Sequence, residues 1–326
     1  MKVKLLFFVL FLVNFAAKAQ NQFESIDEHV YNTPENIGTN LVAITKYVCQ
    51  PAQNDLGRVR AIFTWISNNI DYDVAQLRNP AKLTRQTVAQ TLGSKRAICQ
   101  GYAELFVAMC AVVGIKSEVV AGYSVPLGVA LKKAYFNSNH AWNVVQINGE
   151  WQPLDVTWAS GYIDNSGKEF EGLFNDKHFL TPPSQFINTH IPEDPQWQLL
   201  NQTVSIHFIN PKTTNKQLIY NKNFFNYGDS IAFWQALPSY EQALKSAINA
   251  HNFNPGNNEK LAIAYYNYSI HLIKVQVNTN AYYAARTLLE RAIELSEKDN
   301  FEQAKGVIDD CDVAIDYINE KLNKWQ

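Results

Sequence analysis

The sequence predicts an α+β protein, with a helix that begins at a cysteine, an antiparallel hairpin after it and an all-α C-terminal region. Three observations lead to this prediction. Apolar residues recur at helical spacing up to Gly114. Two runs of alternating residues flank Asn148-Gly149, and Asn-Gly between such runs is the strongest short-range hairpin signal. From about residue 238 to the C-terminus, the apolar spacing is helical again.

The first 19 residues have the pattern of a secretory signal peptide. Lys2 and Lys4 precede the apolar run LLFFVLFLVNFAA, and Ala17-Lys18-Ala19 offers small residues for cleavage. The run is short for a membrane span, so we expect an exported protein, periplasmic or extracellular, without stable membrane insertion. An uncleaved N-terminal anchor is the alternative. Cleavage would remove three lysines and no acid, which changes the net charge from −2 to −5. A chain without a basic stripe is not expected to bind nucleic acid.

The elements before the hairpin follow from the apolar spacing. Residues 23–50 read as mixed helix and loop, and residues 78–98 as a polar connection with a short helical piece. Two longer helices are predicted, one from residue 55 to about 70 and one from Cys99 to Gly114. A short strand, SEVVAGYS, comes next. The hairpin then occupies NHAWNVVQINGEWQPLDVTW.

The chain after the hairpin is predicted in three parts. Residues 161–200 are loop-rich, and TVSIHF and KQLIY indicate two short strands. Four helices are expected over residues 241–253, 259–275, 281–298 and 301–322; without a clean repeat period, a plain helical bundle is favoured over a tetratricopeptide-like array. The predicted domains are a signal peptide (1–19), a catalytic domain (20–200), a short-strand connecting segment (201–237) and a helical C-terminal region (238–326).

The four cysteines, Cys49, Cys99, Cys110 and Cys311, are too few and too scattered for a disulfide framework. They form no CxxC pair, which argues against structural zinc. Cys99 and Cys110 lie roughly 16 Å apart along one predicted helix, too far to bridge. A bridge between Cys49 and Cys311 stays open.

Cys99 stands where a nucleophilic thiol would be expected. The positive end of a helix dipole favours thiolate, and the backbone N–H of Cys99 would be free to donate to an oxyanion. His140 begins the first strand of the hairpin and Asp155 lies on the second. With Asn148-Gly149 as the turn, His140 would lie opposite position 157, diagonal to Asp155 on the same face. The register therefore permits a His–Asp pair beside a reactive thiol.

Each of these residues also has a structural explanation. A cysteine beside an apolar helix is more often an inert core residue, and Asp155 could merely end a strand or cap a turn. Tyr72, Trp142 and Trp158 could line a cleft, although aromatic residues next to strands are usually core. The remaining histidines considered, His178, His190, His207 and His271, show no ligand spacing, and no cofactor or metal is expected.

Three segments resemble the transglutaminase-like superfamily: IFTWISNNIDYD, RAICQGYAELFVAMCAVVGIKSEVVAGYS and NHAWNVVQINGEWQPLDVTW. The core of that family is a relative of the papain fold, with a cysteine-bearing helix on an antiparallel sheet. The later segment HFLTPPSQFINTHIPEDPQWQLL is similar to the kyphoscoliosis-peptidase-like branch. The resemblance covers roughly residues 55–200 and not the helical C-terminus. It implies Cys99 as nucleophile, His140 as general base and Asp155 as the carboxylate that orients the imidazole.

The resemblance implies a cysteine hydrolase or acyltransferase that acts on amides of a protein or peptide through a thioester. A peptidase or deamidase is favoured over crosslinking, because exported members similar to this chain lack the calcium-bearing extra domains of crosslinking transglutaminases. The alternative is a catalytically silent scaffold that binds a protein partner through its C-terminal helices. A third hypothesis is a latent enzyme whose C-terminal helices cover the cleft.

Overall fold

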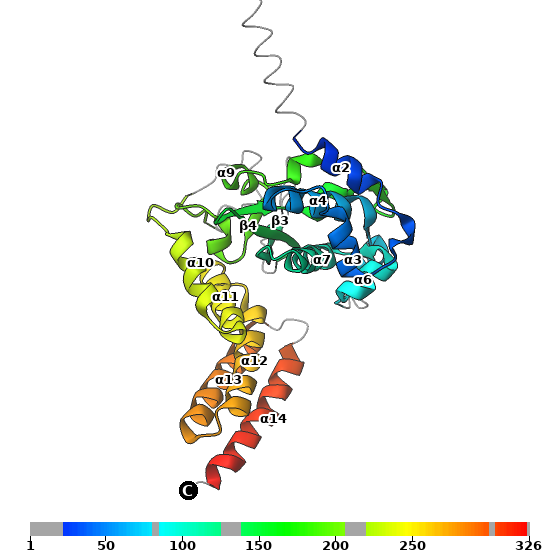
Figure 1. The fold of residues 1–326 in the computed structure, drawn as a ribbon. Helices are drawn as coiled ribbons and strands as arrows, with labels where there is room; N and C mark the ends of the chain where they lie inside the picture. The colour runs from blue at the N-terminus through cyan, green and yellow to red at the C-terminus, as the bar shows by residue number, and fades with distance from the viewer. Residues whose placement is uncertain (1–21, 80–84, 125–137, 206–219, 300–303, 325–326) are drawn as a thin grey trace, which may run out of the picture. The chain divides into compact units, whose positions relative to one another are not determined.

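The computed structural model describes residues 22–79, 85–124, 138–205, 220–299 and 304–324 (Figure 1). The predicted signal peptide lies outside these residues. Two compact units are found, residues 1–120 with 141–182 and residues 121–140 with 183–326, and the division passes through strands β3 and β4. The first unit contains these helices: α2 (Glu24–Tyr31), η1 (Glu35–Ile37), α3 (Leu41–Val48), α4 (Asp55–Asn69), α5 (Val74–Leu77), α6 (Val88–Ser94), α7 (Cys99–Val112), α8 (Val156–Ser160) and η3 (Asp176–His178).

The cysteine-bearing helix α7 packs against α3, α4 and α6 (Figure 1). Its apolar stripe is buried as predicted, because Tyr102, Leu105, Phe106 and Met109 are each fully enclosed. Gly114 follows the helix with a φ of 73°, and the Ile115 N–H donates to the Cys110 carbonyl at 3.0 Å. This is the left-handed ending that glycine favours after a helix.

Helix α4 confirms the predicted helix that starts at residue 55. The side chain of Asn54 accepts a hydrogen bond from the Gly57 N–H and caps its first turn. Val59, Ile62 and Ile66 are fully buried along its core face. Helices α4 and α7 therefore share one hydrophobic core.

A four-stranded sheet has the order β5-β4-β3-β8. Its strands are β3 (Ser117–Ser124), β4 (His140–Ile147), β5 (Glu150–Leu154) and β8 (His190–Pro192); two-residue β1 (Asp71–Tyr72) and β2 (Arg96–Ala97) pair in parallel, and β6 (Gly161–Ile163) pairs with β7 (Phe170–Gly172). The predicted hairpin is confirmed, with Ile147 opposite Glu150. Asn148 and Gly149 both have positive φ, 52° and 85°, as a type I′ turn requires.

The second unit continues from β8 into helices: α9 (Pro183–Phe186), η4 (Pro195–Gln198), α10 (Tyr227–Ala236), α11 (Ser239–Phe253), α12 (Asn258–Val275), α13 (Thr279–Asp299) and α14 (Ala304–Asn323). The four C-terminal helices confirm the prediction of an all-α region. Consecutive helices from α11 to α14 pack against one another, and α14 also contacts α12 (Figure 1). None of the described helices is long and apolar enough to cross a membrane.

Helix α10 corrects the prediction for residues 201–237, which had been expected to contain only short strands. The Asn226 side chain caps it, and the Trp234 ring packs edge-on to Trp197 with centroids 5.4 Å apart. This stabilisation comes from a distant residue, so local spacing could not reveal it. Of the two strands predicted there, an isolated bridge between Val204 and Tyr220 is found, and residues 206–219 lie outside the described part. The predicted domain boundaries stay predictions.

Candidate active site

The predicted nucleophile Cys99 is the first residue of α7. Ile98 precedes the helix in extended conformation and makes no side-chain capping hydrogen bond to its first turn. Glycine at position 101 lets this turn approach its neighbours, because a Cβ there would come within 2.7 Å of the Ala97 Cβ. The cysteine therefore lies at a tightly packed helix N-terminus with backbone donors nearby.

The other three cysteines differ from Cys99 in exposure. All four are free thiols, but Cys49, Cys110 and Cys311 are buried while Cys99 is partly exposed. Burial raises the pKa of each of the three buried thiols to about 12. These thiols would be protonated and inert at neutral pH. The bridge between Cys49 and Cys311 that the sequence left open is not formed.

The hydroxyl of Tyr72 lies beside the Cys99 backbone. Burial raises the pKa of Tyr72, the charges of Cys99 and Asp155 raise it further, and a hydrogen bond from the Cys99 backbone opposes them. The ring of Tyr72 stacks on Tyr102 at 6.4 Å, and the Tyr102 hydroxyl donates to the Ile70 carbonyl. Tyr72 is thus held in place near both the predicted nucleophile and the predicted carboxylate. It had been named only as a residue that could line a cleft.

Asp155 corrects one part of the predicted register. Strand β5 ends at Leu154, so Asp155 follows the strand and does not pair with β4. Its carboxylate Oδ1 accepts hydrogen bonds from the Thr157 and Trp158 backbone N–H groups at 2.8 and 2.9 Å. These bonds make Asp155 the N-cap of helix α8. The cap fixes the fully buried carboxylate in one orientation.

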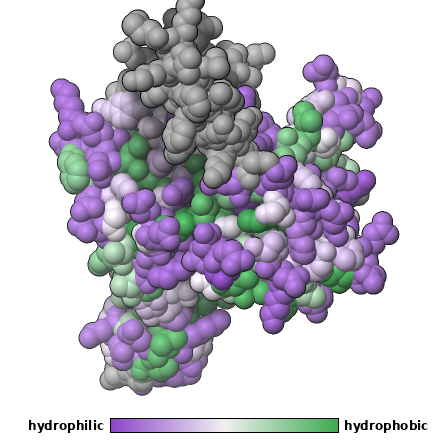
Figure 2. All heavy atoms as spheres, turned by 45° about the horizontal axis from the view of Figure 1, so that its top comes forward, coloured by the Kyte–Doolittle hydropathy of each residue, from purple (hydrophilic) through white to green (hydrophobic). Residues whose placement is uncertain are grey.

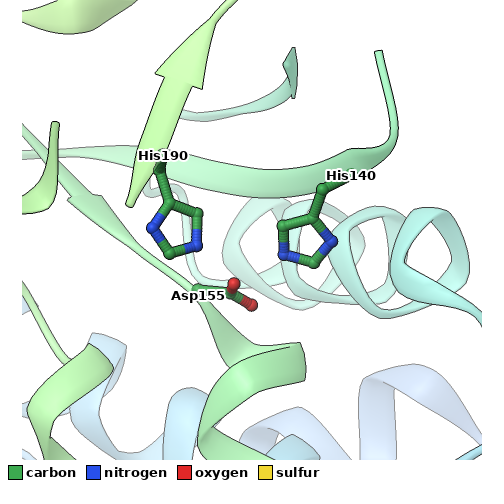
Figure 3. Close-up of side chains that lie close together, drawn as sticks. All are labelled: His140, Asp155 and His190. Atoms are coloured by element: carbon green, nitrogen blue, oxygen red, sulfur yellow. The ribbon is translucent and has the colours of Figure 1, made fainter. Parts of the chain in front are cut away.

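The structure brings His140 and Asp155 together and adds His190. One ligand atom of each of these three residues lies within 4.8 Å of the other two (Figure 3). The rings of His140 and His190 have centroids 5.6 Å apart, and the close-up shows the carboxylate of Asp155 below both rings. Cys99 is not a member of this close group. Cys99 and Asp155 are both close enough to Tyr72 for their charges to raise the pKa of that tyrosine.

His190 was missed in the sequence and had been assigned no role. It is the first residue of β8, fully buried, and its ring stacks on Phe186 with centroids 4.1 Å apart. The Thr189 hydroxyl and His190 Nδ1 form a hydrogen bond of 2.8 Å. Strand β8 pairs with the end of β3, which places His190 opposite Ser124. A three-residue strand in a loop-rich segment carries no periodic signal, so only the fold reveals this position.

Asn143 connects the sheet to the cysteine-bearing helix. Its side-chain amide donates to the Ala103 carbonyl of α7 at 2.9 Å and to the Glu118 carbonyl of β3 at 3.2 Å. Asn143 is fully buried, three residues along β4 from His140. The bond positions α7 relative to β4, so it supports the placement of the predicted nucleophile against the strand that carries the predicted base.

The other predicted cleft residues divide between two environments. Trp142 is only 1% exposed and is a core residue, as aromatic residues next to strands usually are. Trp158 is partly exposed and its ring packs edge-on to His178, with centroids 5.6 Å apart. Of these two tryptophans, Trp158 alone could contact a substrate at the surface.

Comparison with known proteins shows what the part of the chain around Cys99, His140 and Asp155 is similar to. The family model of the transglutaminase-like superfamily matches residues 42–156. The kyphoscoliosis peptidase of Homo sapiens is 35% identical over 208 residues, which cover 63% of this chain and 31% of that protein. Cytokinesis protein 3 of Schizosaccharomyces pombe is 26% identical over 190 residues, 57% of this chain and 21% of that protein. A solved structure of a TGase is 16% identical with a TM-score of 0.29, covering 52% of this chain and 43% of that one. The chain thus spans about a third of the length of its most similar curated relatives.

Proposed function

We propose that this protein is a cysteine hydrolase or acyltransferase, because residues 42–156 match the family model of the transglutaminase-like superfamily. Its substrates would be peptide-bond or side-chain amides of a protein or peptide, and Cys99 would carry the acyl group. The observation that carries the proposal is the convergence of His140, Asp155 and His190 within 4.8 Å. A buried carboxylate beside two imidazoles is an arrangement suited to proton transfer.

The proposed reaction has two steps. In the first, the Cys99 thiolate attacks the amide carbonyl carbon, and the oxyanion accepts a hydrogen bond from the Tyr72 hydroxyl, whose oxygen itself accepts one from the Cys99 backbone N–H. His140 then protonates the leaving amine as the C–N bond breaks, which leaves a thioester on Sγ. In the second step, His140 takes a proton from water, the resulting hydroxide equivalent attacks the thioester, and Cys99 leaves as thiolate.

Asp155 would act by holding the imidazole of His140 and stabilising its cationic form. Its capping bonds to Thr157 and Trp158 prevent the carboxylate from turning away. His190 would provide a second imidazole on the same carboxylate. We assign it the role of a positioning residue, since it is fully buried and anchored by Phe186 and Thr189.

Water is the acyl acceptor that we favour, which makes the protein a peptidase or deamidase. This preference rests on the likeness to exported family members without calcium-bearing domains. Export itself is proposed from the signal-peptide pattern of residues 1–19. The two hydrolytic outcomes differ in product, because a deamidase releases ammonia from glutamine side chains and a peptidase produces new N-termini.

The rate of iodoacetamide labelling as a function of pH tests the proposed site. We expect Cys99 to be labelled quickly even at neutral and mildly acidic pH, because the positive end of a helix dipole favours the reactive thiolate. The His140→Ala variant should lose this low-pH reactivity. His271→Ala is the matched control, because His271 lies on α12 and stacks on Tyr240 at 3.6 Å.

Cys110 serves as an internal reference in the same experiment. Its fully buried thiol, with a pKa raised to about 12, should stay unlabelled throughout. Ordinary reactivity of Cys99 in both the wild type and His140→Ala would contradict the proposal. That outcome would leave the scaffold hypothesis, in which the domain binds proteins without catalysis.

A further inference from the structure

A cleft of about 820 Å³ opens among α12, α14 and the start of α13. This volume lies within the range of ligand-binding clefts in proteins, roughly 300–1,000 Å³. Apolar side chains, among them Ile270 and Ile273, line it together with Tyr282, which is 1% exposed. All of these residues belong to the second unit, outside the candidate active site.

Apolar side chains at the rim of this cleft are unusually exposed. Val313 is 71% exposed and Val277 is 67% exposed, although both border an apolar interior. Single exposed apolar residues are normal on protein surfaces, but a group of them around a concave site indicates a binding surface. On the face of the molecule drawn in Figure 2, green hydrophobic residues lie scattered among purple hydrophilic ones.

The two ends of the cleft carry opposite charge. Asp310 lies at one end, close enough to Tyr266 that its charge raises the pKa of that tyrosine. Lys274, Lys321 and Lys324 also line the cleft, from the last turns of α12 and α14. Lys321 lies over the Tyr317 ring at 5.0 Å, and Lys324 pairs with Glu320. One of the three lysines is thus partly neutralised, and the basic end keeps a positive excess.

The separation of these charges sets the length of a ligand. Asp310 and Lys321 are eleven residues apart on one helix, which corresponds to roughly 16 Å along its axis. An extended peptide rises about 3.3 Å per residue, so about five residues would span this distance. Such a peptide would lay apolar side chains on Ile270, Ile273 and Val313 and end at the lysines.

We propose that this cleft binds the C-terminal end of another protein as an extended apolar peptide, with its terminal carboxylate at Lys274 and Lys321. The argument is charge complementarity between one carboxylate and the lysines at the basic end, combined with an apolar lining. A C-terminus fits better than an internal acidic segment, because a single carboxylate at the end of an apolar run matches cations at one end only. The cleft would therefore recruit a protein to this chain independently of the proposed catalysis.

Binding of the full-length protein to a peptide library tests the proposal. The probe is a set of hexapeptides tethered by their N-termini and randomised at every position, prepared with either a free C-terminal carboxylate or a C-terminal amide. We expect binders with apolar residues before a free carboxylate, and an at least tenfold weaker signal for the amidated forms. Lys321→Glu and, separately, Lys274→Gln should weaken binding at least fivefold.

The matched control is Lys305→Glu, because Lys305 is an exposed lysine on the same helix α14 that does not line the cleft. This variant should bind as the wild type does, and thermal melts should show all three variants folded. Equal binding of acid and amide peptides, or an equal effect of Lys305→Glu and Lys321→Glu, would overturn the proposal. Binding only to vesicles of phosphatidylserine and phosphatidylcholine, lost in Lys321→Glu, would also overturn it in favour of an anionic surface.

Discussion

The hydroxyl of Tyr72, whose oxygen accepts a hydrogen bond from the Cys99 backbone N–H, is our proposed donor to the oxyanion. We expect Tyr72→Phe to lower kcat by about 10²-fold, the usual loss when one oxyanion donor is removed. The ring and its stacking on Tyr102 would remain, so stability and the pH dependence of Cys99 labelling should change little. Steady-state kinetics on an amide substrate, beside the labelling assay, would separate the two effects. An unchanged kcat would exclude Tyr72 as a donor.

The close approach of His140, Asp155 and His190 predicts sensitivity to zinc. Two imidazoles and one carboxylate within 4.8 Å are ligands that Zn²⁺ prefers, and a bound ion would occupy the nitrogen that must move protons. We expect Zn²⁺ to inhibit the proposed activity and EDTA to restore it. His190→Ala should weaken zinc binding by about 10-fold or more, measured by calorimetry. The control His271→Ala should leave the zinc affinity unchanged, and an equal loss in both variants would contradict a site at this position.

Individual site residues differ in how far the sequence could reveal them. Cys99 and His140 lie at the starts of a helix and a strand, and such boundaries follow from apolar spacing and a strong turn signal. His190 lies on a three-residue strand whose partner is more than sixty residues earlier in the chain. Local patterns carry no information on such a pairing. Its proximity to Asp155 could therefore be seen only in the fold.

At the scale of elements, the hairpin register was predictable as far as the strand continues. The Asn148-Gly149 turn fixes Ile147 opposite Glu150, and the pairing follows from there to Asn143 and Leu154. The sequence could not show where the strand stops, because Asp155 fits both a strand end and a helix cap. In the structure Asp155 acts as a helix cap, because its carboxylate accepts hydrogen bonds from two backbone N–H groups in the first turn of α8.

Helix α4 is joined to the elements around it by the buried side chain of Arg60, which is 4% exposed. Its guanidinium pairs with Asp27 of α2 at 2.6 Å and with Asp176 of η3, and it lies 5.0 Å from the Phe179 ring centroid. Removing one partner of a buried pair costs about 3–5 kcal/mol. We therefore expect Arg60→Met to lower the free energy of unfolding by about 3 kcal/mol in urea titrations.

Arg58→Met is the matched control for this prediction. Arg58 lies on the same helix and pairs with Asp55 at 2.6 Å, but both side chains are more than a third exposed. Exposed pairs of this kind contribute at most about 1 kcal/mol. Equal losses in the two variants would mean that the buried guanidinium does not connect these elements.

At the scale of the whole molecule, buried polar groups join β8 to the C-terminal helices within the second unit. Glu193 and Asp194 directly follow β8 and are only 3% and 4% exposed. Lys260 of α12 pairs with Glu193, and the Asn249 side chain of α11 donates to both carboxylate oxygens of Asp194. The sequence indicated the helices by their spacing, whereas this connection depends on long-range pairs of polar residues. The helical region is therefore more than an appended bundle.

Asp194 makes the stability of this connection depend on pH. Burial raises the pKa of Asp194 from 3.8 to about 6, although hydrogen bonds from Asn249 and the Gln196 backbone act in the opposite direction. Between about pH 4 and pH 6 the folded chain therefore binds more protons at this residue than the unfolded chain does. Stability from this residue is greatest below its unfolded pKa and falls as pH rises towards 6. The difference between the folded and unfolded pKa values of Asp194 corresponds to a loss of roughly 3 kcal/mol of stability at most.

The Asp194→Asn variant should remove this fall. As pH rises from 4 to 7, the wild type should lose about 2–3 kcal/mol more of its free energy of unfolding than Asp194→Asn does. Urea titrations at half-unit pH intervals would measure that difference, and Asp309→Asn, an exposed substitution on α14, provides the control. Parallel curves for Asp194→Asn and the wild type would show that Asp194 ionises as readily in the folded chain as in the unfolded one. In that case its burial would be fully offset by Asn249 and Gln196, and the connection between β8 and α11 would not depend on pH.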